Sequence, residues 1–483
     1  MTSRRQAALA SWLVPAAVAL VVFAGHVRSP NVTIADSQRT IPLAESMVHG
    51  SLDLRWAVVL PAQEGTHGLY RATGDEGPVY SSYPLGPGLL AVPVVAGIDL
   101  LAKAGVGRSA RDRLQHGSWA LERLVASIVV ALTAAVLYLV SLVVLTGSLR
   151  RRRLVATAVA LTFAFGTGAW STASRALWQH GPSMLLLSLA LLVAVRSRSD
   201  PRLVALLGLP VAAAYVTRPT NLIPLLAFSV WVAVCHRRQA LGYLLGLAAI
   251  AVPFVLVNLH SYGAVLSPYY RPGGQGRNAQ VVEALVGNLV SPARGLFVFS
   301  PVLFLGVAGA VRAVRRHRFD GVDVVVWTSV VLHWVVISTT APDWWGGHSF
   351  GPRLFTDMIP FLVYSALPVL QPAPATDAKV RRSWPRPVAI SAVTVLLVVS
   401  MAVHFQGATM RSTWCWNDEP VDVDEEPSRV WSLSPPQALA GYASLAGGAS
   451  FASESVEGGS VMAGCPGPSG APRPQDPASG VDP

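Results

Sequence analysis

Charged residues are scarce in this sequence. They make up 13% of the 483 residues, whereas hydrophobic residues make up 52% and the mean hydropathy is +0.47. A soluble domain of this length could not bury so much apolar surface. Apolar runs of about 17 to 25 residues recur along the chain, and in hydrocarbon each must be helical, because no water satisfies its backbone N–H and C=O groups. The sequence therefore predicts an all-α polytopic membrane protein.

Many basic residues lie in short clusters before or between the apolar runs. The clusters are Arg4-Arg5, Arg150 to Arg153, Arg196 with Arg198 and Arg202, Arg237-Arg238, Arg312 to Arg318, and Lys379 to Arg386. Cytoplasmic loops are enriched in lysine and arginine, so all clusters are assigned to the cytoplasm. This predicts about eleven spans, a cytoplasmic N-terminus and an extracytoplasmic C-terminus. The expected spans are residues 7–24, 119–146, 154–173, 182–196, 202–218, 219–235, 240–258, 295–312, 322–340, 354–370 and 387–405.

One apolar run, from Leu85 to Lys103, does not fit this alternation. Counting it as a span would place Arg150 to Arg153 outside, and its prolines and glycines make a poor straight helix. We expect a short helix in or near the outer leaflet, so that residues 25–118 form one large external loop of a transmembrane domain covering residues 1–405. A true span at this position is the rival topology.

Several catalytic motifs are absent. The chain has no GxxxxGK[ST] phosphate loop, no HExxH, no paired CxxC and no GxSxG. An ATP-driven pump, a zincin protease and an α/β-hydrolase are disfavoured accordingly. The net charge of +11 does not indicate nucleic-acid binding, because most of the excess positive charge is assigned to the topogenic loops and no basic and aromatic surface is expected outside them.

Cysteine is also rare, with three residues in the chain. Cys235 falls at a cytoplasmic helix end, whereas Cys415 and Cys465 fall in the external tail, residues 406–483, where an oxidising environment would allow them to pair. The tail is acidic, and its composition predicts disorder from about residue 458. It contains no soluble catalytic domain.

Polar residues that are not topogenic gather on the external side. They include Asp36, Arg39, Glu45, His49, Arg175, Trp178, Gln179, His180, Arg218, Tyr269, Tyr270, Arg271, Arg294, Asp343, Trp344, Trp345, His348, Arg353 and Asp357. Ionisable residues near a membrane cost free energy, so this clustering indicates an external site. Arginines hold phosphate through paired N–H donors, tryptophans stack on sugars and a carboxylate serves as a base. Because nucleotide sugars are absent outside the cell, a lipid-linked sugar donor suits this chemistry.

The opening of the chain resembles the GT-C superfamily of membrane glycosyltransferases, which includes protein O-mannosyltransferases and lipid A aminoarabinose transferases. The resemblance rests on Asp36, Ala44 and Gly50, on the proline-rich segment 83–87, and on Arg123-Leu124. It covers roughly residues 1–260 and implies inverting transfer from a polyprenyl-phosphate sugar, with Asp36 as catalytic base. Many members have a second acid after the third span, where this chain has Arg175, Gln179 and His180. No metal or other cofactor is therefore expected.

Each predicted site residue also has a simpler interpretation. Asp36 and Arg39, spaced i, i+3, also suit an exposed surface pair. Glu45 is a candidate second acid, although Pro42 separates it from Asp36. His180 and His348 also suit buried hydrogen-bonded positions, and Arg353, a candidate phosphate ligand, also suits snorkelling to lipid headgroups.

Three further candidates lie in external loops. Tyr270 and Arg271 precede Pro272-Gly273-Gly274 and suit a flexible loop that covers the donor. Trp345 suits either a sugar platform or an interfacial aromatic belt.

The sequence therefore predicts a glycosyltransferase of a bacterial cell membrane. It would transfer a sugar to an envelope glycan, lipid or protein. A secondary transporter or lipid flippase is the alternative from another class, although the second half does not repeat the first. A catalytically inactive GT-C fold acting as an assembly subunit is the third possibility.

Overall fold

The computed structural model describes residues 2–31, 37–56, 69–71, 77–105, 119–270, 277–371 and 386–445. The helices of the first half are α1 (Thr2–Arg28), α2 (Thr40–Val48), α3 (Gly86–Lys103), α5 (Trp119–Val144), α6 (Leu149–Phe165), α7 (His180–Arg196), α8 (Gly208–Thr217), α9 (Leu222–Cys235) and α10 (Ala240–Tyr262). Those of the second half are α11 (Val281–Val290), α12 (Leu296–Phe299), α13 (Phe304–Arg315), α14 (Gly321–Thr340), α15 (Ile359–Leu370), α16 (Arg386–Thr409), α17 (Ser412–Cys415) and α18 (Ala440–Leu445). Strands β1 (Leu69–Arg71) and β2 (Val79–Ser81) pair antiparallel, with Tyr70 opposite Tyr80.

Helices occupy the segments in which the sequence predicts spans. Within the described ranges, six are long and apolar enough to cross a membrane: Gly86–Lys103, Trp119–Val144, Arg237–Tyr262, Gly321–Thr340, Arg353–Leu370 and Pro387–Thr409. The expected span 295–312 is interrupted instead, because α12 ends at Phe299 and α13 begins at Phe304. Pro301 lies between them and lacks the N–H that a continuous helix requires. The total number of spans and their sidedness stay predictions.

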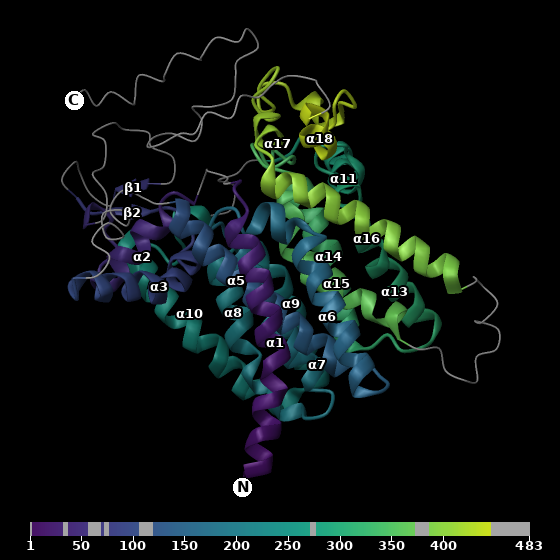
Figure 1. The fold of residues 1–483 in the computed structure, drawn as a ribbon. Coiled ribbons are helices and arrows are strands. Elements are labelled where there is room, and N and C mark those ends of the chain that lie inside the picture. Colours follow the sequence, from purple (N-terminus) through teal and green to yellow (C-terminus); the bar gives the residue numbers. More distant parts are fainter. Residues whose placement is uncertain are drawn as a thin grey trace.

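The helix of residues 86–103, α3, meets the length and hydropathy needed for a span. Figure 1 shows it lying across the direction of α1, beside α2 and the β-hairpin. It packs mainly against α2 through an apolar cluster that includes Ile41, Ala44, Ala91 and Val95. The placement of α3 in the outer leaflet rather than across the bilayer stays a prediction.

Close helix contacts depend on glycine at two positions. A Cβ on Gly309 of α13 would lie 1.9 Å from the carbonyl oxygen of Ser365 in α15, and one on Gly208 of α8 would lie 2.1 Å from the carbonyl oxygen of Tyr243 in α10. Small residues allow helix backbones to approach closely where hydrocarbon surrounds the helices. The two helix pairs therefore pack backbone against backbone.

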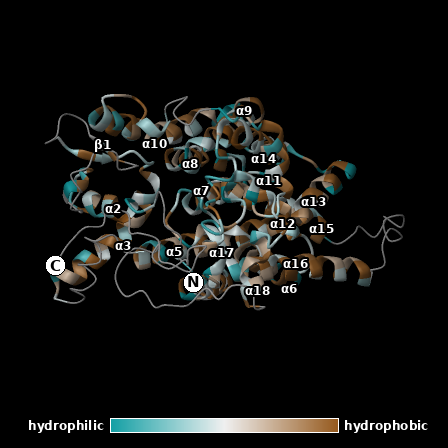
Figure 2. Cartoon of the chain, turned by 90° about the horizontal axis from the view of Figure 1, so that it is seen from above, coloured by the Kyte–Doolittle hydropathy of each residue, from teal (hydrophilic) through white to brown (hydrophobic). Residues whose placement is uncertain are grey.

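The outer surface of the bundle is apolar. Figure 2 shows many hydrophobic residues along α9, α13 and α16, which lie at the periphery of the molecule. Exposed large side chains on two of these helices include Leu222, Leu226, Val230, Val234, Val388, Ile390, Val395 and Val398. A surface of this kind is unfavourable in water and suits contact with lipid.

The two ends of the bundle differ. The N-terminus lies at one end in Figure 1, and α17 and α18 lie at the other. Four arginines from two of the basic clusters, Arg198, Arg312, Arg316 and Arg318, line one hollow together with Asp320. The fold thus gathers residues that the sequence assigns to the cytoplasmic side.

Residues 412–445, called the cap below, are folded over the opposite end. Arg294, which is 1% exposed, donates hydrogen bonds to the carbonyl oxygens of Trp345 (2.7 Å) and Gly347 (3.1 Å), to Asn417 Oδ1 (2.8 Å) and to Gln437. Burial lowers the pKa of Arg294 to about 9, so its guanidinium is charged at neutral pH. It joins the cap to residues 341–352, the outer loop between α14 and the turn that precedes α15.

The sequence also led to expectations for the three cysteines. Cys235 is a free thiol and Cys415 is disulfide-bonded. Cys465, the expected partner, and the segment from residue 458 lie outside the described residues.

Candidate functional site

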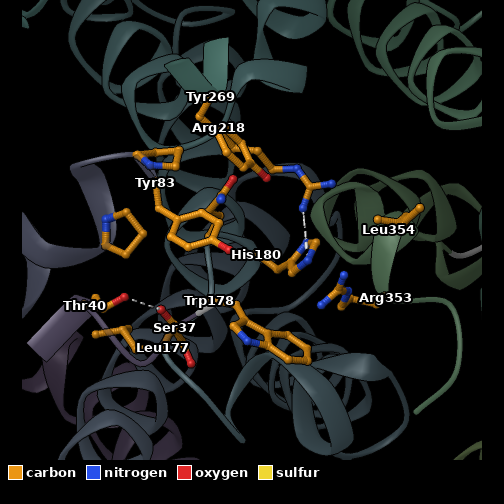
Figure 3. Close-up of a pocket in the computed structure, with 13 residues that line it drawn as sticks. Ser37, Thr40, Tyr83, Leu177, Trp178, His180, Arg218, Tyr269, Arg353 and Leu354 are labelled. Carbon is orange, nitrogen blue, oxygen red and sulfur yellow. Dashed lines mark hydrogen bonds between the residues drawn. The ribbon is translucent and has the colours of Figure 1, made fainter. Parts of the chain in front are cut away.

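A cavity of about 60 Å³ lies at the capped end of the bundle. Its walls come from the first external loop, the segment before α7, the end of α8, the loop after α10 and the turn before α15. The lining residues are Ser37, Thr40, Tyr83, Pro84, Pro87, Leu177, Trp178, Gln179, His180, Arg218, Tyr269, Arg353 and Leu354. Figure 3 shows Arg218 and Arg353 approaching His180 from two sides, with Ser37 and Thr40 across the cavity.

A buried network of three residues forms one wall. Asp357, which is fully buried, lies with Oδ2 2.9 Å from Arg218 Nε and with Oδ1 3.2 Å from His180 Nδ1. Arg218 Nη1 also contacts His180 Nε2 at 3.1 Å. Arg218 Nη1 also contacts His180 Nδ1, so this ring nitrogen lies between the guanidinium and the Asp357 carboxylate. The Asp357 carboxylate thus holds the Arg218 guanidinium and the His180 imidazole at the cavity.

Arg353 is held on an aromatic face at the same cavity. Its guanidinium carbon lies 4.8 Å from the centroid of the Trp178 ring, and Trp178 is buried. Stacking of this kind fixes the plane of the guanidinium and adds a cation–π attraction. With Arg218, this side chain gives the described part of the cavity two cationic groups against one buried carboxylate.

The first external loop forms the opposite wall. Ser37 is buried and its carbonyl oxygen accepts a hydrogen bond from the Thr40 backbone N–H at 2.8 Å. Thr40 Oγ1 donates to the Leu177 carbonyl oxygen at 3.5 Å. Arg39 is partly buried, and burial lowers the pKa of its guanidinium while nearby Tyr83 opposes that shift. Asp36, the predicted base, lies outside the described residues and directly precedes Ser37 in the chain.

Arg175 does not reach the cavity. It is fully buried, and its N–H groups donate to the carbonyl oxygens of His26, Ser29 (2.8 Å) and Asn31 (3.2 Å) and to Ser174 Oγ. Burial lowers the pKa of Arg175 to about 9, so the group stays charged at neutral pH. The sequence suggested a substrate ligand, whereas the contacts give Arg175 the role of fixing residues 29–31, just before the undescribed segment with Asp36.

Two other predicted site residues, Glu45 and Tyr270, do not line the cavity, and a third, Arg271, is not described. Glu45 is buried in α2 and does not line the cavity. Tyr270 is buried and donates its hydroxyl to the Val216 carbonyl oxygen at 2.6 Å, while its neighbour Tyr269 lines the cavity. Arg271 lies outside the described residues.

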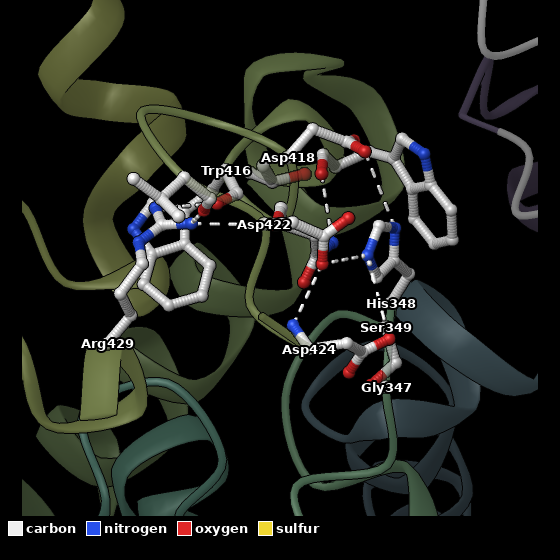
Figure 4. Close-up of polar contacts among 12 residues, drawn as sticks. Gly347, His348, Ser349, Trp416, Asp418, Asp422, Asp424 and Arg429 are labelled. Carbon is white, nitrogen blue, oxygen red and sulfur yellow. Dashed lines mark hydrogen bonds and ion pairs between the residues drawn. The ribbon is translucent and has the colours of Figure 1, made fainter. Parts of the chain in front are cut away.

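Trp345 and His348 lie at a separate place, between the outer loop and the cap. Trp345 Nε1 donates to Asp424 Oδ1 at 2.6 Å. His348 faces Asp418, Asp422 and Asp424 (Figure 4). Neither residue lines the cavity, so the predicted site divides into two groups.

Glu122, at the start of α5, is a residue that the sequence reasoning missed. It is 3% exposed, and its Oε2 accepts the Leu177 N–H at 3.2 Å. Leu177 is part of the cavity wall, so this hydrogen bond from its backbone N–H to Glu122 helps to hold the wall in place. An acid in the first turn of an apolar helix was the signal, because buried ionisable groups in membranes are costly.

No protein-family model matches the chain, and no curated protein matches it. The chain is similar to the solved structure titled "Crystal Structure of ArnT from Cupriavidus metallidurans bound to Undecaprenyl phosphate", with 15% sequence identity and a TM-score of 0.47. The similarity covers 82% of this chain and 71% of that chain. At this identity and TM-score the likeness assigns no activity, and the proposal below rests on the residues of this chain.

Proposed function

We propose that the protein is a membrane glycosyltransferase that moves a sugar from a polyprenyl-phosphate donor to a cell-envelope acceptor. The transfer takes place on the extracytoplasmic face of a bacterial cell membrane, with inversion at the sugar carbon. The single observation that carries the proposal is the position of Arg218 and Arg353 on one wall of a cavity whose other wall includes Ser37, next to Asp36.

The arginines supply the site for the donor phosphate. Guanidinium groups bind phosphate through paired N–H donors, and their charge stabilises the negative charge that grows on a phosphate leaving group. Asp357 pairs with Arg218 and fixes its position, while Trp178 fixes Arg353. The two cations are therefore held in place before the donor binds, which limits the reorganisation needed in the transition state.

Asp36 is proposed as the general base. As the acceptor hydroxyl attacks the sugar carbon, its proton passes to the carboxylate, the bond from the sugar to phosphate oxygen breaks, and the polyprenyl phosphate departs. Arg175 holds residues 29–31 and the Thr40–Leu177 contact holds the chain after Ser37. Both sides of the Asp36 segment are thus fixed to the bundle.

The aromatic residues suit the sugar. Tyr83, Trp178 and Tyr269 all line the cavity, and aromatic faces pack against the apolar C–H surfaces of sugar rings. The apolar exterior of the bundle suits the polyprenyl chain, which would remain in the lipid while its phosphate enters the cavity.

The test is transfer of radiolabel from a panel of polyprenyl-phosphate sugars to membrane extract. It compares purified wild-type protein with Asp36→Asn and Arg353→Gln, with Asp343→Asn and Arg315→Gln as controls of the same charge change at exposed positions. We expect wild-type protein and controls to transfer label and both site variants to lose most of it while remaining folded. Undiminished transfer by Asp36→Asn would exclude this residue as the base. Absence of transfer by the wild type across the panel would favour a transporter or an inactive subunit.

A further inference from the structure

We propose that His348, Asp422 and Asp424 bind a divalent transition-metal ion, Zn²⁺ in preference to Mg²⁺ or Ca²⁺. The ion would join the outer loop to the cap. This site is separate from the cavity and does not depend on the proposed transferase activity.

The three ligand atoms converge at a spacing that a small metal ion requires. His348 Nε2 lies 2.9 Å from Asp422 Oδ1 and 3.7 Å from Asp424 Oδ2, and all three residues offer ligand atoms within 4.8 Å of one another. Ligands at about 2.0–2.2 Å from a tetrahedral Zn²⁺ are separated by about 3.3 Å. The two separations from Nε2 lie on either side of that value and the third is at most 4.8 Å, so side-chain movements would bring all three ligands to one ion.

A second set of contacts orients these ligands. Asp418 Oδ1 lies 3.6 Å from His348 Nδ1, on the side of the ring opposite Nε2 (Figure 4). A carboxylate in this position can accept a hydrogen bond from Nδ1–H, as in the carboxylate–histidine pairs of many zinc sites, whereas Nε2, which is hydrogen-bonded to Asp422 Oδ1 at 2.9 Å, would exchange that contact for the metal. Trp345 Nε1 donates to Asp424 Oδ1 at 2.6 Å, and Oδ2 of the same carboxylate is directed to His348. The cluster is therefore more than a group of surface acids.

The charge of the cluster also favours a cation. Three aspartates, Asp418, Asp422 and Asp424, surround the imidazole of His348. Arg429 donates to backbone carbonyl oxygens, including that of Trp416 at 2.8 Å, and Arg294 donates to the contacts described above. Arg429 interacts electrostatically with Asp418 and Asp422, and Arg294 interacts with Asp424. A divalent ion at Nε2 would reduce the repulsion among the carboxylates directly.

The chemistry of the ligands selects the metal. Mg²⁺ and Ca²⁺ prefer oxygen ligands alone, whereas an imidazole nitrogen with carboxylate oxygens suits Zn²⁺. Three protein ligands leave a coordination position for water. The partial exposure of His348 and Asp422, with 17% and 21% of their side-chain surfaces accessible, gives an ion a route from solvent.

The place of the site gives the ion a structural role. His348 belongs to the outer loop, whereas both aspartates belong to the cap. Five residues after His348 the chain reaches Arg353 at the cavity. A metal bridge would therefore fix the cap against the segment that leads to Arg353.

The experiment uses the full chain in detergent, with any affinity tag removed. The protein is stripped with EDTA, equilibrated with Zn²⁺, separated by gel filtration and analysed for metal content, and its unfolding temperature is followed with Zn²⁺, Ca²⁺, Mg²⁺ and EDTA. We expect the wild type to retain one more equivalent of Zn²⁺ than Asp422→Asn/Asp424→Asn. We also expect a rise in unfolding temperature with Zn²⁺ that EDTA reverses.

The control is Glu425→Gln, which removes a neighbouring exposed acid outside the cluster and should bind Zn²⁺ like the wild type. If the double variant fails to fold, Asp418→Asn tests the proposal through the orienting carboxylate, with an expected loss of about 10- to 100-fold in Zn²⁺ affinity. Equal Zn²⁺ content and equal thermal response in wild type and double variant would overturn the proposal. So would a wild type that binds no Zn²⁺, which would leave His348 as an ion-pair partner of the aspartates only.

Discussion

Arg218 and Asp357 form an ion pair that is almost closed to solvent. Arg218 Nε lies 2.9 Å from Asp357 Oδ2, and the two side chains are 8% and 0% exposed. The pair joins the end of α8 to the turn that leads into α15. Removal of two charges from water is costly, so each partner requires the other. This relationship fixes one of the two cavity arginines.

Asp357→Asn is expected to destabilise the protein strongly. The change leaves Arg218 buried without its carboxylate, and the loss of one partner of a buried pair costs about 3–5 kcal/mol in the free energy of unfolding. Denaturant-induced unfolding in detergent measures the effect. Asp343→Asn, at an exposed position, should change the same quantity by less than about 0.5 kcal/mol. Equal stabilities of the two variants would contradict a paired role for Asp357.

Trp178→Ala should weaken use of the donor more than Trp178→Phe. Arg353 loses its aromatic face in the alanine variant, whereas phenylalanine keeps part of the cation–π attraction. For a desolvated pair we expect a loss of about 1–2 kcal/mol, or about 5- to 30-fold in kcat/KM for the polyprenyl-phosphate sugar. The measurement is the initial rate of transfer at varied donor concentration. A loss of the same size in both variants would indicate that Trp178 acts through packing alone.

Arg175→Gln tests whether a buried arginine positions the segment that leads to the proposed base, Asp36. The variant loses charge-assisted hydrogen bonds to the carbonyl oxygens of His26, Ser29 and Asn31. We expect a loss of at least about 2 kcal/mol in the free energy of unfolding. In the folded fraction we expect a lower kcat with little change in donor KM, because residues 29–31 lead to the proposed base rather than to the phosphate site. A rise in donor KM with an unchanged kcat would instead make Arg175 a donor ligand.

The sequence predicted the helices better than the roles of the polar residues. Apolar runs identify membrane helices because every backbone group in hydrocarbon must be satisfied within the segment. The alternation of basic clusters and apolar runs also predicted that Arg218, Arg353 and His180 lie on one side of the membrane. The structure brings these three residues together at one cavity.

The sequence could not predict which of several similar residues line the cavity and which have structural roles. Arg175 and Arg353 both follow apolar runs on the expected external side. Arg175 donates a hydrogen bond to the Ser29 carbonyl oxygen and holds that segment in place, whereas Arg353 lines the cavity. His180 and His348 also differ in their surroundings, since His180 faces Asp357 at the cavity and His348 faces Asp422 of the cap. These contacts join residues 70 to 180 positions apart, and the pattern of hydrophobicity along one chain carries no information about them.

The packing of α13 on α15 gives a prediction that concerns the fold alone. A methyl group on Gly309 would meet the Ser365 carbonyl oxygen at 1.9 Å, so Gly309→Ala must push two helix backbones apart. We expect a loss of about 1–3 kcal/mol in the free energy of unfolding, which is the usual cost of overpacking. Gly97→Ala in α3 is the matched control, because no atom lies within 4 Å of its added methyl group, and alanine favours a helix over glycine by about 1 kcal/mol. The two variants should therefore move the unfolding temperature in opposite directions, and a Gly309→Ala protein as stable as the wild type would contradict the close approach of these helices.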